Sequence, residues 1–498
     1  MASFQSHRFT SDPGGRTIGF LMSALIQPPQ SGLAQSKGRV LAVTFVLALG
    51  YVMAMLDATA VNVALNTIKA EFGAPLASLV WVVDAYTLSF AALLLLGGAM
   101  ADRLGAKRTY MIGLVWFIAA SAFCGLAPST DLLVVARLLQ GLGAALFMPS
   151  SMSLITESFP ERVQRAKQIS IWGAVVGAAA GAGPLVGGLL VSLFGWRSIF
   201  YLNIPIGILA IVLSAMLLRP SSTRSRRFSA LSHALIMVTL GALSFVLIEG
   251  PVLGWLMSLQ IQLASLVAAA ALAMLVFREL RSGSPVVPIV LARNARFWAF
   301  NGMGFMVNFT LFGQIFVLSL YLQQTRGEGP LATGLYMLPL MALITVMNIV
   351  SGYVAARFGI VRVLTTGFLL SSAGCLLTAL LGVEGPRWMS AMTIALCNAG
   401  FGLAIPSVIV AIMQEAGQQN ANIGAATLNA NRQIGSLAGV AAMGIVLHWV
   451  GDWNIGTRLA FLSFGACMAT AAVLVFWPKS GHDRQPVGSS EPMAPASE

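Results

Sequence analysis

The chain has 498 residues, of which 57% are hydrophobic and only 9% are charged. Soluble globular proteins carry about 25% charged residues, so the composition excludes an ordinary soluble protein and indicates a polytopic membrane protein. The formal net charge of +12 is not concentrated in one compact basic segment, and the four cysteines lie scattered in apolar runs without paired spacing. These observations argue against a nucleic-acid partner, a disulfide framework and a cysteine zinc site.

Long apolar runs recur along the whole chain. A helix that crosses about 30 Å of hydrocarbon needs roughly 20 apolar residues, and the runs do not alternate with the period of two expected of β-barrel strands. Fourteen runs lie near residues 39–66, 78–100, 108–127, 131–152, 167–192, 198–218, 230–249, 257–277, 297–321, 331–355, 361–382, 388–413, 425–449 and 459–477. The sequence therefore predicts an all-α membrane protein with about fourteen transmembrane helices.

Lys and Arg are distributed unequally among the predicted loops. With the N-terminus in the cytoplasm, 22 of the 29 basic residues lie in cytoplasmic segments and 5 in outer loops. Because cytoplasmic loops are enriched in Lys and Arg, we expect both termini in the cytoplasm. The bias also explains the net charge without a nucleic-acid partner. Interfacial tryptophans are expected at the span ends: Trp81, Trp196, Trp255, Trp298, Trp388, Trp449 and Trp453.

Part of the sequence occurs twice. The segment from Gly98 to Arg108 is echoed from Gly352 to Arg362, 254 residues later, with Gly, Arg, Gly and Arg at matching positions. Two similar halves are the sequence signature of a transporter. The expected organisation is a cytoplasmic tail (1–38), an N-terminal six-helix bundle (39–218), a basic linker (219–229), two extra helices (230–277), a cytoplasmic loop (278–296), a C-terminal six-helix bundle (297–477) and a disordered cytoplasmic tail (478–498).

The first copy of the repeated segment has the composition of a functional loop. Its glycines allow a tight turn, and Asp102 can pair with an arginine or a helix N-terminus. A turn that only carries positive charge requires neither the aspartate nor the glycine spacing. We therefore interpret this loop as functional, with Gly98, Asp102, Arg103, Gly105, Lys107 and Arg108 as its candidate residues.

Charged side chains within apolar runs are the candidates for proton coupling: Asp57, Arg137 and Asp84. A charge at the bilayer centre costs at least about 2.5–3.5 kcal/mol on insertion scales, so each requires a partner or water. Burial favours the neutral form of a carboxylic acid, which would let Asp57 exchange a proton near neutral pH. The alternative for Asp57 and Arg137 is a structural ion pair. Asp84 is either a surface carboxylate or a site residue that attracts protons.

Other residues of the spans have a packing interpretation beside the functional one. In the fifth span, glycines four apart allow close helix contact and a proline kinks the helix; the residues are Gly177, Gly181, Gly183, Pro184, Gly187 and Gly188. Candidate cavity residues are Asn62, Gln140, Asn308, Gln314, Asn429 and Arg432, any of which could instead join two helices. Glu249 is interpreted as an interfacial cap.

Over essentially its whole length the chain resembles the major facilitator superfamily, and within it the fourteen-span drug:proton antiporters. Residues 98–108 are similar to the superfamily's signature loop, which implies a gating loop that acts as a cytoplasmic latch of the outward-facing state. Ala356 replaces the aspartate in the second copy, so only the first would form a charge-based latch. Residues 133–145 resemble the second motif of proton-coupled members, 183–188 the exporters' antiporter motif, and 56–65 the first-span motif. Residues 147–154 and 428–437 resemble the methylenomycin A resistance subfamily; substrate identity is not carried over.

The resemblance implies a proton-coupled exporter of antibiotics or other small amphipathic toxic compounds that works by alternating access. It would lie in the cytoplasmic membrane as a monomer, driven by the proton motive force without cofactor or metal. The expected partners are the lipid bilayer, protons and a small-molecule substrate. Alternatives are a proton symporter that takes up a small organic solute and an exporter of an endogenous metabolite. An enzyme is not expected, because the four histidines are not clustered, and an ATP-driven pump is not expected without a phosphate-binding loop.

Overall fold

The computed structural model describes residues 37–221, 223, 230–281, 287–381 and 385–476. The chain divides into two units, residues 1–42 and 43–498. Of the first unit only residues 37–42, which begin helix α2, are described. Nearly all of the two expected disordered tails and most of the linker 219–229 lie outside the described residues.

The described residues are almost entirely helical, and their fourteen membrane-length helices confirm the predicted fold class. The elements are α2 (Lys37–Phe72), α3 (Leu76–Leu104), α4 (Ala106–Leu126), α5 (Thr130–Ser158), α6 (Arg162–Phe194), α7 (Arg197–Leu217), α8 (Ala230–Leu253), α9 (Leu259–Arg281), α10 (Ile289–Ala292), α11 (Ala295–Gln324), α12 (Pro330–Phe358), α13 (Ile360–Leu381), α14 (Arg387–Val450) and α15 (Trp453–Leu474). α10 is too short to span a membrane. α14 contributes two spans, because Gly417 interrupts it with a φ of 73°.

Local sequence fixes where several helices begin. Within apolar surroundings a helix satisfies its own backbone except at its ends, and side chains supply the missing acceptors there. Ser129 accepts a hydrogen bond from the backbone N–H of Leu132 at the start of α5. Asn294 and Asp452 each accept two backbone N–H groups at the starts of α11 and α15.

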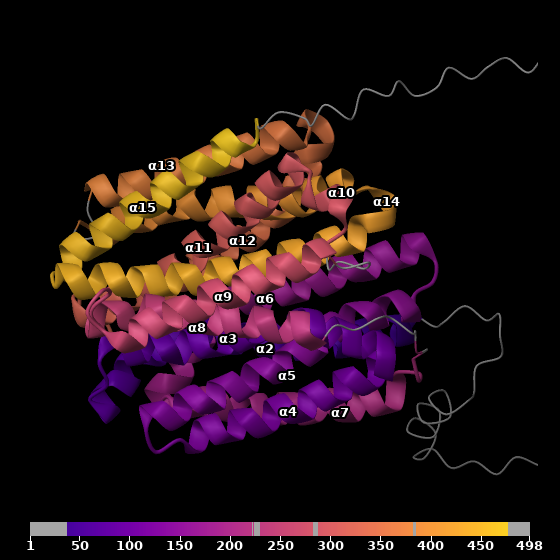
Figure 1. Ribbon diagram of the computed structural model, residues 1–498, viewed down its shortest axis with the longest axis horizontal. Coiled ribbons are helices and arrows are strands. Elements are labelled where there is room, and N and C mark those ends of the chain that lie inside the picture. Colours follow the sequence, from indigo (N-terminus) through magenta and orange to yellow (C-terminus); the bar gives the residue numbers. More distant parts are fainter. Residues whose placement is uncertain (1–36, 222, 224–229, 282–286, 382–384, 477–498) are drawn as a thin grey trace, which may run out of the picture. The chain divides into compact units, whose positions relative to one another are not determined.

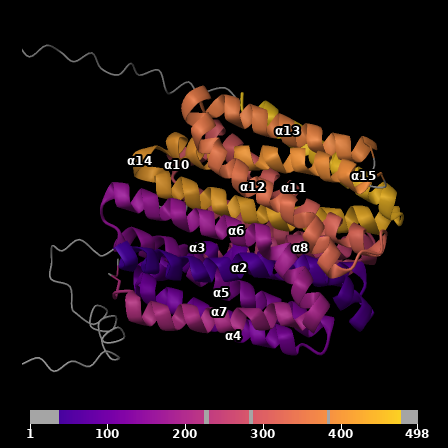
Figure 2. The same cartoon turned by 180° about the vertical axis from the view of Figure 1, so that it is seen from behind.

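The helices form two groups that lie side by side. Figures 1 and 2 show α2 to α7 together on one side and α11 to α15 together on the other. α6 packs against α12 of the other group, and α3 packs against α14. The extra helices α8 and α9 pack on each other, and α8 contacts both α3 and α14. The indole Nε1 of Trp81 donates to Glu249 of α8 at 2.7 Å, so Glu249, interpreted above as an interfacial cap, joins two helices.

The repeat seen in the sequence is also a structural repeat. α3 and α12 begin and end at positions 254 residues apart. Each is followed by a single glycine, Gly105 or Gly359, with φ of 89° or 84°, and then by the next helix. Such positive φ values strain any residue with a side chain, which explains why glycine stands at both positions.

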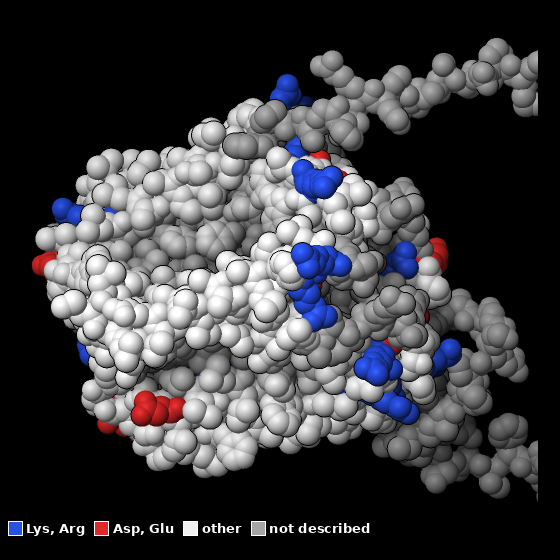
Figure 3. Space-filling view, in the orientation of Figure 1, with Lys and Arg blue, Asp and Glu red and all other residues white. Residues whose placement is uncertain are grey.

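Basic side chains are concentrated toward one end of the helices. Figure 3 shows most of the visible Lys and Arg gathered toward that end, with few on the apolar sides. The basic turn with Arg103, Lys107 and Arg108 joins α3 to α4. This distribution follows the Lys and Arg bias that predicts a cytoplasmic end.

Candidate functional site

An ion pair lies buried inside the first group of helices. Asp57 of α2 contacts Arg137 of α5 through Oδ2 and Nη1, and both side chains are fully shielded from solvent. The Nε of Arg137 donates to the carbonyl oxygen of Val82 on α3 at 3.0 Å. Its guanidinium carbon lies 4.5 Å from the centre of the Tyr86 ring, where the cation is stabilised by the π face. The pair therefore connects three helices.

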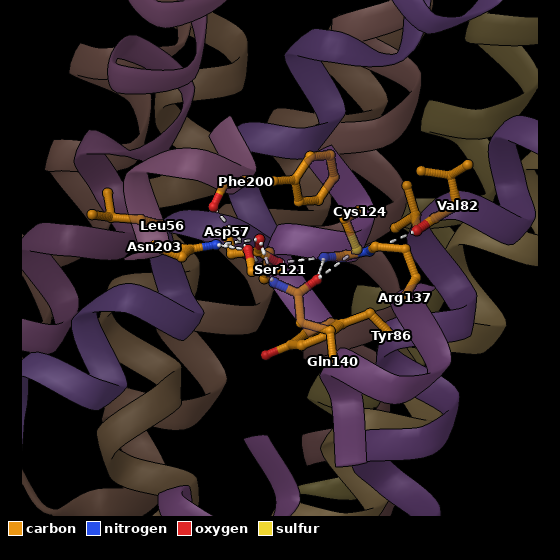
Figure 4. Close-up of polar contacts among 12 residues, drawn as sticks. Leu56, Asp57, Val82, Tyr86, Ser121, Cys124, Arg137, Gln140, Phe200 and Asn203 are labelled. Carbon is orange, nitrogen blue, oxygen red and sulfur yellow. Dashed lines mark hydrogen bonds and ion pairs between the residues drawn. The ribbon is translucent and has the colours of Figure 1, made fainter. Parts of the chain in front are cut away.

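Neutral polar side chains complete the surroundings of Asp57 (Figure 4). Gln140 of α5 and Asn203 of α7 each donate an amide N–H to Asp57 Oδ1 at 2.9 Å. Gln140 also accepts a hydrogen bond from Arg137 at 2.7 Å, as their spacing on one helix face predicts. Ser121 of α4 accepts from Asn203 at 3.0 Å. Five helices thus contribute to one network.

The network couples the protonation of Asp57 to its neighbours. While Asp57 is ionised, it neutralises Arg137 and accepts amide donors from two helices. Protonation would leave the Arg137 cation without a countercharge, and a buried unpaired charge costs several kcal/mol. Proton uptake therefore requires this part of the bundle to rearrange or to admit water or another anion. This arrangement can convert a proton into a change of helix packing.

The structure does not bring Asp84 into this network. Asp84 lies on α3, fully buried, and neither carboxylate oxygen has a hydrogen-bond partner among the described residues. Asn62 of α2 is also buried; its amide donates to the Ala58 carbonyl oxygen at 3.1 Å, and its Oδ1 has no described partner. Its own carbonyl oxygen accepts from Ser319 of α11 at 2.8 Å, a contact between the two helix groups.

The other cavity candidates belong to the second group and fall into two places. Arg432 of α14 donates through Nε to the amide oxygen of Asn308 at 3.1 Å, and Asn429 lies half-buried one turn before Arg432. Gln314 lies elsewhere in the group, where it donates to Asn398 at 3.3 Å and accepts from the Cys397 thiol. The structure therefore brings Arg432 and Asn308 together and leaves Gln314 apart.

The predicted gating loop is fastened to its own helix group. The Lys107 ammonium donates to the carbonyl oxygens of Leu218 at 2.5 Å and Ala215 at 3.2 Å, at the C-terminal end of α7, where a helix favours a cation. The backbone N–H of Lys107 donates to Ser221 at 3.1 Å. A Cβ at Gly105 would lie 3.2 Å from the Ser221 carbonyl oxygen. Gly98 lies within α3 with open space around it, whereas Asp102, Arg103 and Arg108 lie near the turn, partly or fully exposed.

The glycines of α6 divide into two kinds. A Cβ at Gly183 or Gly187 would collide with Thr59 or Ala60, which follow Asp57 on α2. A Cβ at Gly188 would collide with the Pro330 carbonyl oxygen at the start of α12. At Gly177 and Gly181 a Cβ would meet only ordinary contacts, at 3.6–3.8 Å. The last part of the motif therefore places α6, with Pro184, tightly between the helix of Asp57 and the other helix group.

The two groups meet closely at the end of the bundle where α2 and α11 finish. Gln323 of α11 donates to the carbonyl oxygen of Val63 at 3.0 Å, and Lys69 donates to Gln324 at 3.1 Å. Apolar side chains of both helices share one buried cluster. A Cβ at Gly444 of α14 would lie 2.7 Å from the Val80 side chain of α3. This is the end that the basic-residue bias predicts to face outward.

Several residues of these sites were missed by the sequence reasoning. Ser121, Asn203 and Tyr86 contact the Asp57 network, yet neutral and aromatic residues are common in spans and none stood out. Among the described residues, no three His, Cys, Asp or Glu side chains are grouped to hold a metal ion.

Comparison with known proteins identifies the group to which the chain belongs. The family model described as Major Facilitator Superfamily matches residues 47–440. A methylenomycin A resistance protein of Streptomyces coelicolor is 45% identical over 84% of this chain and 88% of its own, and one of Bacillus subtilis is 41% identical over 89% and 95%. A solved structure of a peptide transporter, POT, superposes with a TM-score of 0.66 at 16% identity over 91% of this chain and 96% of its own. The chain belongs to the major facilitator superfamily of membrane transport proteins.

Proposed function

We propose that this protein is a proton-coupled exporter of antibiotics or other small amphipathic toxic compounds. Membership of the superfamily implies a small-molecule substrate and a multi-pass membrane location. Relatives named as methylenomycin A resistance proteins, at 41–45% identity, support drug export, as does a relative from Streptomyces glaucescens named a tetracenomycin C resistance and export protein, at 31% identity. We place the protein in the cytoplasmic membrane as a monomer, and the Lys and Arg bias supports placing both termini in the cytoplasm.

The buried pair of Asp57 and Arg137 carries the proposal. It is the place where a proton taken up from one side would alter helix contacts, because α3 accepts a hydrogen bond from Arg137, α7 donates one to Asp57, and α4 joins the network through Asn203. α2 continues from Asp57 into the contacts of Thr59 and Ala60 with α6. Protonation would therefore act on the packing between the two helix groups and shift the balance between inward-open and outward-open states.

The driving force follows from elementary electrostatics. Moving one elementary charge across 100 mV is worth about 2.3 kcal/mol, which is close to a fifty-fold concentration ratio. In the proposed cycle Asp57 takes up a proton from outside and releases it inside, and the substrate leaves in the opposite step. No cofactor or metal takes part in this scheme, and no covalent chemistry occurs.

Proton-driven accumulation of substrate in inverted membrane vesicles tests the proposal. We expect D57N to abolish accumulation of an exported dye or antibiotic driven by an acidic interior, because a neutral amide cannot carry the proton. D131N is the matched control, since Asp131 is an exposed acid on α5, and it should accumulate like the wild type. Undiminished coupled accumulation by D57N removes Asp57 from this role. Accumulation in right-side-out vesicles with an acidic exterior would favour the symporter alternative.

A further inference from the structure

Among the described residues, Arg137 and Arg432 lie deep within spans rather than near their ends, and they differ in their countercharge. Arg137 is paired with Asp57. Arg432 lies about ten residues into the span Ile423–Val450, near its middle, and within the described residues it forms no ion pair. In the described part of the chain, the only hydrogen bond of its side chain is the one from Nε to the Asn308 amide oxygen. An isolated cation at this depth is costly, so the missing anion needs an explanation.

The surroundings of Arg432 have the composition of a binding site. Asn308 of α11 is itself held by a hydrogen bond to Ser436 at 3.1 Å, which directs its amide oxygen to Arg432. From the other helix group, Tyr51 of α2 lies close enough to Arg432 for each side chain to influence the charge of the other. The Tyr51 ring meets the Trp172 ring of α6 edge to face, with centroids 4.7 Å apart. Both helix groups therefore supply residues to one place near the middle of the membrane.

Two donors at this place have unused capacity. The buried indole Nε1 of Trp172 has no hydrogen-bond partner among the described residues. The Arg432 guanidinium forms one described hydrogen bond, although it has five N–H donors in a planar fork that matches a carboxylate. The half-buried Arg432 side chain is accessible. A cationic fork, a free indole donor and two aromatic rings fit a carboxylate attached to a ring or other apolar body.

We propose that Arg432, Asn308, Tyr51 and Trp172 bind a small organic anion, a carboxylate on an apolar body, as the transported substrate. The compound would supply the countercharge that Arg432 lacks, and its apolar part would pack on the two rings. This inference rests on the proposed function and specifies the substrate class. Export of a monovalent anion against one entering proton moves two charges in the same electrical sense, so the membrane potential should drive it more strongly than export of a neutral compound.

Binding to purified full-length protein tests the substrate class directly. The probes are 1-naphthoate and cyclohexanecarboxylate, each compared with its neutral carboxamide by equilibrium dialysis. We expect the wild type to bind at least one carboxylate about tenfold or more tightly than its amide. R432Q should remove that preference, because the amide side chain has no charge. R387Q is the matched control: Arg387 is an exposed arginine already paired with Glu328, and the preference should persist there.

The outcomes separate this inference from the proposed function. If neither carboxylate binds more tightly than its amide, or if R432Q keeps the full preference, the anion site is wrong. Proton-coupled export of neutral or cationic compounds, with its loss in D57N, would still support the proposed function. If R432Q does not yield monodisperse protein, the test is transport by the wild type in proteoliposomes. A potassium diffusion potential at equal pH should drive transport of the carboxylate that binds. A transport rate that does not depend on the potential would overturn the proposed anion site.

Discussion

The hydrogen bonds around Asp57 connect one buried carboxylate to several helices. Arg137 supplies the countercharge, but Asn203 reaches the carboxylate from α7 and Gln140 reaches it from α5. Donors to an ionised carboxylate stabilise its charged form. A movement of α7 would therefore change the surroundings of the Asp57 carboxylate, and Asn203 is the residue through which α7 acts on it.

Replacing Asn203 by leucine should slow transport. The substitution keeps the branched shape and the number of heavy atoms of the side chain but removes the donor to Asp57 Oδ1 at 2.9 Å. Loss of a hydrogen bond to a charged group costs roughly 1.5 kcal/mol, so the helix arrangement that this network holds is weakened and the initial rate in inverted vesicles should fall several-fold. S121A, which removes a partner of Asn203 but no contact with Asp57, should slow transport less; equal initial rates in N203L and the wild type would contradict the prediction.

Sequence reasoning could identify Asp57 and Arg137 for a simple physical reason. A charge in an apolar run is costly wherever the helix faces, so it is conspicuous before any packing is known. Neutral polar and aromatic residues such as Asn203, Tyr51 and Trp172 are not conspicuous in this way. Their importance depends on which helices are neighbours, and the contacts between α2 and α6 or α7 join residues more than 100 positions apart.

At the scale of elements, α6 determines how the two helix groups fit together. Gly183 and Gly187 allow α2 to lie against α6, and Gly188 allows the start of α12 to do so. The contact with α12 is reciprocal, because a Cβ at Gly334 would collide with the Pro184 carbonyl oxygen. Close approach through small residues is a general means of helix association in membranes. In this protein these close contacts link α2, which carries Asp57, to the surface where α6 and α12 of the two helix groups meet.

Replacing Gly188 by alanine should weaken the conformation in which α6 and α12 touch. The new methyl group would overlap the Pro330 backbone oxygen, which cannot move like a flexible side chain. Overpacking of this kind costs about 1–3 kcal/mol, enough to shift the balance of states several-fold. Accessibility of cysteines placed at the outer end of α12 to a membrane-impermeant thiol reagent should rise.

G177A serves as the control for that experiment. A Cβ there would meet Thr345 at an ordinary 3.7 Å, so the same chemical change on the same helix should leave accessibility and transport close to wild type. If G188A and G177A behave alike, the close contact with Pro330 is not what holds this conformation.

At the scale of the whole molecule, the fold was predictable because two independent signals agreed. Apolar runs gave the number of spans, and the offset of 254 residues between the repeated loops recurs in the ends of α3 and α12. The conformational state was not predictable, since every transporter of this kind must form contacts at both ends in turn. Only the packed residues, such as Val80 against Gly444, indicate that the expected outer end is closed here.

A disulfide between α3 and α14 should lock this closed end. The variant V80C/G444C is made in a background in which the four native cysteines are replaced by serine. A Cβ at position 444 would lie 3.8 Å from the Val80 Cβ, which is the usual Cβ separation in a disulfide. Since alternating access requires α3 and α14 to separate there, oxidation should abolish transport, and dithiothreitol should restore it. The single variants V80C and G444C control for the substitutions. Full transport by oxidised protein that is shown by mass spectrometry to be cross-linked would mean that these helices stay together throughout the cycle.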